Sequence, residues 1–137
     1  LQEAAAFVQP GRYQTEAAIQ SVHAGRLFDR DPNPQALVHL YQVLVRQTES
    51  IGAAVSLAAA YLAAAEFEAA ARQLATISSE MVSDYQPYWV TRARYFTDTK
   101  QLKAAEAAYA RAIEFTTDPN LAEYLASEQS RLVKQQT

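Results

Sequence analysis

Apolar residues recur along most of this chain at intervals of three and four, the period of an α-helix with one buried face. The clearest stretch fills the positions i, i+3, i+4, i+7 and i+8 without a gap, with Leu37, Leu40, Tyr41, Leu44 and Val45. Asn33 suits the N-cap of this helix, and Pro34 suits its first position because the missing N–H would have no intrahelical partner there. Strand-like runs rich in Val, Ile and Thr are missing. The pattern predicts an all-α fold.

Breaks in the pattern divide the chain into about six or seven helices. The predicted helices span residues 13–28, 34–47, 51–66, 67–79, 85–96, 102–115 and 119–134. Asp118 can cap the last one, and Leu121, Leu125 and Leu132 are expected to face inward. We predict one domain over residues 1–137, made of a leading helix pair (10–50), two hairpins (51–79 and 85–118) and a capping helix (119–135).

The two hairpins align with each other when one is shifted by 35 residues. This shift pairs Tyr61 with Phe96, Phe67 with Leu102, Ala70 with Ala105, Leu74 with Tyr109, and Ile77 with Ala112. The tetratricopeptide repeat (TPR) has a period of about 34 residues, an aromatic residue in its first helix and small residues where its helices cross. The first copy is degenerate, since Ala54 stands where the second has Trp89. The sequence predicts a TPR-like array of antiparallel helical hairpins in a right-handed superhelix.

Composition limits the possible partners. The formal net charge is −3, whereas a domain that grips nucleic acid by its phosphates needs a basic face, so we expect no direct contact with nucleic acid. No apolar run approaches the ~20 residues of a membrane span, and no membrane contact is expected. The absence of cysteine fits a reducing, cytoplasmic setting. Because the chain begins at Leu1 without an initiator methionine, we expect it to be a fragment of a longer protein.

No constellation of catalytic or metal-binding residues stands out. The two histidines, His23 and His39, have no carboxylate or second histidine at helical spacing, so packing or surface placement is the simpler interpretation. The serines lack a nearby His–Asp arrangement, and the glycines occur singly, which excludes a phosphate-cradling loop. We therefore predict that the domain is not an enzyme and binds neither cofactor nor metal.

The aromatic stretch at 85–96 admits two interpretations. Trp89 and Phe96 share a helix face, and their burial between helices is the expected outcome. Tyr85 and Tyr88 precede the core of that helix and are candidates for contact with a partner.

A second group of candidates follows from the TPR pattern. Arg94 falls where TPR domains line their concave groove, and Val90 lies on the same helix. Val55, Ala59 and Leu62 belong to the corresponding face of the first hairpin. An apolar groove with an arginine could hold a partner helix or an acidic tail, although an arginine on a solvated face is the simpler interpretation.

The succession of these segments resembles the C-terminal extension of one group of extracytoplasmic-function (ECF) RNA polymerase sigma factors. The resemblance covers about residues 10–132. It depends most on two strings, Tyr13-Gln14…Ala17-Ala18-Ile19…Val22-His23-Ala24 and Tyr85-Gln86-Pro87-Tyr88-Trp89…Arg92-Ala93, the latter leading to Thr116-Thr117-Asp118-Pro119. The chain departs from that family at residues 51–56, which read IGAAVS where the family has an LNRAVA-like string.

The resemblance implies a regulatory domain in transcription initiation. Its expected partners are the sigma core, RNA polymerase or a regulatory protein, with small YCII-related proteins among the possible regulators. DNA would be read by the sigma core, which is absent from this chain. A free-standing TPR adaptor without a role in transcription is the alternative interpretation.

Overall fold

The computed structural model describes residues 11, 14–19, 33–78 and 80–136. Within these residues all regular secondary structure is helical, which confirms the predicted all-α class. Residues 14–19 are helical, and six further helices follow: α3 (Pro34–Gln47), α4 (Ile51–Ala63), α5 (Phe67–Ala75), α6 (Gln86–Asp98), α7 (Leu102–Glu114) and α8 (Pro119–Gln136). Most of the helix predicted over 13–28, including Val22, His23 and Leu27, lies outside the described residues.

The starts of α3, α4 and α8 are fixed by short polar side chains. The Asn33 Oδ1 accepts hydrogen bonds from the N–H groups of the next helix residues, at 3.0 and 3.4 Å, which confirms it as the N-cap of α3. The Ser50 Oγ accepts from the N–H of Ala53 at 3.3 Å. The Asp118 Oδ1 accepts from the N–H of Asn120 at 2.9 Å, as the predicted cap of α8 should.

The turns inside the two hairpins have the same backbone structure. Ala65 and Lys100, 35 residues apart, both adopt a left-handed conformation, with φ of 59° and 64°. In the first turn the N–H of Glu66 donates to the carbonyl of Tyr61 (2.9 Å); in the second the N–H of Gln101 donates to the carbonyl of Phe96 (2.8 Å). Each turn is therefore a Schellman motif.

Two helices end earlier than predicted. The extension of α4 to residue 66 was wrong, because the left-handed Ala65 ends the helix at Ala63. The extension of α5 to residue 79 was also wrong, because α5 ends at Ala75. The Thr76 hydroxyl donates to the carbonyl of Gln73 at 2.6 Å, and the chain then turns toward α6.

Buried alanines allow the paired helices to pack closely. Ala58 and Ala93 occupy corresponding positions of α4 and α6, and both are completely buried. The same holds for Ala70 of α5 and Ala105 of α7. At these two pairs of positions the 35-residue alignment corresponds to equal burial.

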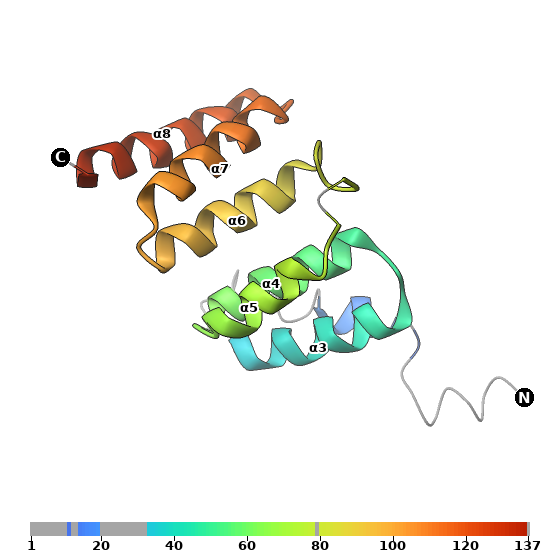
Figure 1. The fold of residues 1–137 in the computed structure, drawn as a ribbon. Coiled ribbons are helices and arrows are strands. Elements are labelled where there is room, and N and C mark those ends of the chain that lie inside the picture. Colours follow the sequence, from blue (N-terminus) through green and yellow to red (C-terminus); the bar gives the residue numbers. More distant parts are fainter. Residues whose placement is uncertain (1–10, 12–13, 20–32, 79, 137) are drawn as a thin grey trace, which may run out of the picture.

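The core is continuous along the series of helices. One cluster joins Ile19 to α3 and α4, a second joins α4, α5 and the start of α6, and a third joins α6, α7 and α8. Figure 1 shows α3, α4 and α5 grouped together, with α6, α7 and α8 following in a row. Leu125 and Leu132 of α8 are buried and Leu121 is partly buried, as predicted. Each hairpin thus buries its apolar surface against its neighbours.

Candidate functional site

A groove lies where α4, α6 and α8 meet on one side of the domain. Its apolar half has a volume of about 310 Å³. The side chains that line this half come from three helices that are not consecutive in the chain: Val55, Ser56 and Ala59 of α4, Gln86, Pro87, Val90, Thr91 and Arg94 of α6, and Leu121, Tyr124 and Leu125 of α8.

A polar half continues the groove between α6, α7 and α8. Its volume is about 500 Å³. It shares Val90, Arg94, Tyr124 and Leu125 with the apolar half and adds Thr97, Asp98, Tyr109 and Glu128. Because four side chains line both halves, the two halves adjoin. We call the whole the α4–α6–α8 groove.

The structure brings together four of the seven residues proposed from the sequence. Val55, Ala59, Val90 and Arg94 all line the apolar half of the groove. Val55 is only 3% exposed, so it forms the floor and has little surface for a partner. Arg94 is exposed and also lines the polar half, which places its guanidinium where the two halves meet.

The other three residues lie elsewhere. Tyr88, a candidate for contact with a partner, is buried: it is 3% exposed and belongs to the same core cluster as the fully buried Val82. Leu62, 4% exposed, lies in the last turn of α4, beyond the residues of that helix that line the groove. Tyr85 is partly buried against the cluster that joins α4, α5 and α6.

Tyr124 is one of the groove residues that the sequence interpretation missed. It is 59% exposed at the junction of the two halves, and exposed aromatic side chains beside a groove often dominate binding to a protein partner. The helix was interpreted only as a cap, so its contribution to a surface was not considered. A signal was present, since one more 35-residue step aligns Leu125 with Val90 and Val55, which also line the groove.

The carboxylates of the groove lie in its polar half, whereas the guanidinium of Arg94 lines both halves. Arg94 contributes a cation, and Asp98 and Glu128 contribute carboxylates. Glu128 forms an ion pair with Arg131 at 3.4 Å, but the Arg131 side chain is 68% exposed, and such pairs contribute about 0–1 kcal/mol.

Tyr109 lies among these charges in the polar half. Burial raises the pKa of its phenol above the ordinary value of 10.0, and Glu128 and Tyr124 act in the same direction. A hydrogen bond with Thr97 and the charge of Arg94 oppose this shift in pKa.

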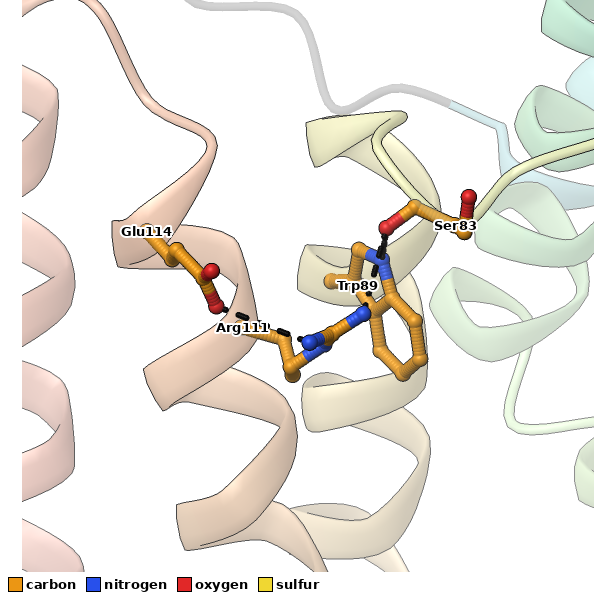
Figure 2. A network of polar contacts seen from close by, with 4 residues as sticks. All are labelled: Ser83, Trp89, Arg111 and Glu114. Atoms are coloured by element: carbon orange, nitrogen blue, oxygen red, sulfur yellow. Dashed lines mark hydrogen bonds and ion pairs between the residues drawn. The ribbon is translucent and has the colours of Figure 1, made fainter.

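A network away from the groove residues holds the connection between α5 and α6. Figure 2 shows the carbonyl of Ser83 accepting hydrogen bonds from the indole N–H of Trp89 (3.1 Å) and the guanidinium of Arg111 (3.4 Å). Arg111 also lies over the Trp89 ring, 5.1 Å from its centroid, and forms an ion pair with Glu114 at 3.6 Å. Trp89 is thus partly buried among the helices, as expected, and its contacts are structural.

Arg92 makes a similar set of contacts on α6. Its guanidinium lies between 5.2 and 5.7 Å from the ring centroids of Tyr88, Trp89 and Phe96, and donates to the Tyr88 hydroxyl at 3.1 Å. These contacts hold Arg92 against its own helix. Arg94, two residues further on, is the arginine that lines the groove.

The described part of the chain contains no group of three or more His, Cys, Asp or Glu side chains that could hold a metal ion. Among the helices described, none is long and apolar enough to cross a membrane.

Comparison with known proteins identifies no relative. No protein-family model, curated protein or solved structure matches this chain. The fold and the groove therefore define the class only as far as an all-helical domain with a surface groove.

Proposed function

We propose that this chain is a TPR-like protein-interaction domain, in which successive hairpins form a right-handed array. The observation that carries the proposal is that the groove is built mainly from α4, α6 and α8, the alternate helices of the series. Alternate helices line the concave surface of a stacked hairpin array. The two Schellman turns, 35 residues apart, support a repeat of that length.

The proposed biological role is that of a regulatory extension of an ECF sigma factor. It would modulate transcription initiation by contact with the sigma core, the polymerase or a regulatory protein. The resemblance of the hairpin over 85–118 to that family supports this role. A free-standing TPR adaptor is the alternative, since the site itself does not depend on the identity of the partner.

Binding between purified proteins tests the proposal. The intact chain would be immobilised and offered purified sigma-core fragments and RNA polymerase, together with an Arg94→Glu variant. We expect wild-type protein to retain one of these partners and Arg94→Glu to bind it with a changed affinity at an unchanged melting temperature: weaker for a partner that places a carboxylate beside residue 94, and tighter for one that places a cation there. Lys103→Glu is the matched control, because it makes the same charge change at an exposed position of α7 that does not line the groove.

The outcomes separate the two roles. If neither purified partner binds the wild-type chain, the role in transcription is wrong, and the adaptor becomes the better interpretation. If a partner binds equally well to Arg94→Glu, the groove is not its binding site.

A further inference from the structure

The two halves of the α4–α6–α8 groove differ in the chemistry that they present to a ligand. The apolar half contains Val55, Val90 and Leu121 and no carboxylate. At about 310 Å³ it lies at the lower end of ligand pockets, roughly 300–1,000 Å³, which suits one large aliphatic side chain. The polar half, which adjoins it, contains two carboxylates and one guanidinium.

The charge balance of the polar half disfavours an acidic ligand. A carboxylate placed beside Arg94 would also face Asp98 and Glu128, and juxtaposed like charges reduce affinity. A cation placed there would have two carboxylates as partners, of which it would share Glu128 with the exposed Arg131. The formal net charge of the chain, −3, acts in the same direction by attracting basic partners during association.

Tyr124 adds a second feature that suits a cation. Its side chain is 59% exposed and lines both halves of the groove. The face of an exposed tyrosine ring attracts a lysine ammonium or, more often, an arginine guanidinium.

The position of Asp98 separates its effect on binding from its effect on folding. It is the last residue of α6, where the helix dipole is negative and an acidic side chain is disfavoured. Loss of this charge should therefore leave stability unchanged or raise it. A fall in affinity without a fall in stability would identify it as a binding group.

We propose that the groove binds a protein segment with one aliphatic anchor side chain and, within about one helical turn of it, a lysine or arginine. The aliphatic side chain enters the apolar half, and the basic side chain lies between Asp98, Glu128 and the ring of Tyr124. This inference rests on the proposed function, because it takes the groove as the binding site, and it specifies the chemistry of the partner.

Selection from a random peptide library tests the inference. Displayed peptides of about ten residues would be selected on the intact 137-residue chain, and the enriched sequences would be synthesised and measured by fluorescence anisotropy. We expect enriched peptides to combine an aliphatic residue with a nearby lysine or arginine. The double variant Asp98→Asn/Glu128→Gln should bind them about tenfold more weakly. Its free energy of unfolding should fall by no more than the small contribution of the Glu128–Arg131 ion pair.

A matched variant controls for the general loss of negative charge. Glu68→Gln/Glu123→Gln removes the same number of carboxylates from exposed positions of α5 and α8 that do not line the groove. It should bind the selected peptides within about twofold of the wild type. A second variant, Val90→Asp, should lose binding by placing a charge in the apolar half.

Three results would overturn the inference: enrichment of acidic peptides, no enrichment, or affinities that Asp98→Asn/Glu128→Gln and its control change equally. The test is independent of the proposed role. Sigma-core capture that fails with Arg94→Glu, combined with enrichment of acidic peptides, would retain the proposed function and reject the inference. If basic peptides were enriched and their binding required Asp98 and Glu128, but neither sigma core nor polymerase were captured, the inference would be retained and the proposed role in transcription rejected.

Discussion

Replacement of Ala65 and Lys100 by glycine tests the two hairpin turns directly. Both residues have a φ in the left-handed region, 59° and 64°, where a Cβ costs about 1–2 kcal/mol. Glycine removes this cost but has about 0.5–1 kcal/mol more conformational entropy to lose on folding. Ala65→Gly should therefore raise the free energy of unfolding by about 0.5–1 kcal/mol. Lys100→Gly should gain a few tenths of a kcal/mol less, because it removes a cation near the C-terminus of α6.

The size of the effect can be measured by equilibrium unfolding. A gain of this size raises the melting temperature of a domain of this length by about 1–4 °C. The two sites lie in different hairpins, so their effects should add to within about 0.5 kcal/mol in the double variant. Guanidinium titration followed by far-UV circular dichroism gives both the midpoint and the m-value, and an unchanged m-value excludes an effect on compactness.

An exposed alanine inside a helix provides the contrast. Ala107 lies in the interior of α7, where glycine should destabilise the protein by about 1 kcal/mol. If Ala65→Gly raised the free energy of unfolding and Ala107→Gly lowered it, position 65 would be shown to be left-handed in solution. If Ala65→Gly lost as much stability as Ala107→Gly, the assignment of the Schellman turn would be refuted.

Two further predictions concern single side chains. The raised pKa of Tyr109 means that the folded state resists its ionisation, so the associated stability is fully present below pH 10.0 and is lost as the pH rises further. Tyr109→Phe should reduce this alkaline loss of the free energy of unfolding, measured by denaturant titrations between about pH 8 and about pH 11. If the free energy of unfolding of the variant fell with pH as steeply as that of the wild type, the reasoning would be contradicted. Trp89→Phe removes the hydrogen bond to Ser83 and weakens the contact with Arg111, so it should cost about 1–2 kcal/mol by thermal unfolding. A loss below about 0.3 kcal/mol would show that the network contributes little.

The helices could be predicted from the sequence more reliably than their ends. Periodic apolar positions identified each helix, and Asn33 and Asp118 marked two of the starts because N-caps have a recognisable chemistry. The ends of α4 and α5 were missed because no glycine marks them. A left-handed turn at Ala65 is unusual for that residue type, and only the hydrogen bonds of the folded chain identify it.

The groove could be predicted only in part. Val55, Val90 and Arg94 were identified because equivalent positions of two helices lie on the same side of a hairpin array. The burial of Tyr88 could not be predicted from its place near a helix start. It shares a core cluster with the fully buried Val82, which belongs to the connection before that helix. Such a contact between a loop and a helix has no periodic signal.

The matching turns at Ala65 and Lys100 also bear on how the chain can change in length during evolution. One inserted residue in either turn would disrupt the hydrogen bonds of its Schellman motif and change how the following helix, with Ala70 or Ala105, meets its partner. The connections over 76–85 and 115–118 join one hairpin to the next and already differ in length. Insertions and deletions among relatives of this chain should therefore occur between hairpins, while the distance from each first helix to its partner stays constant.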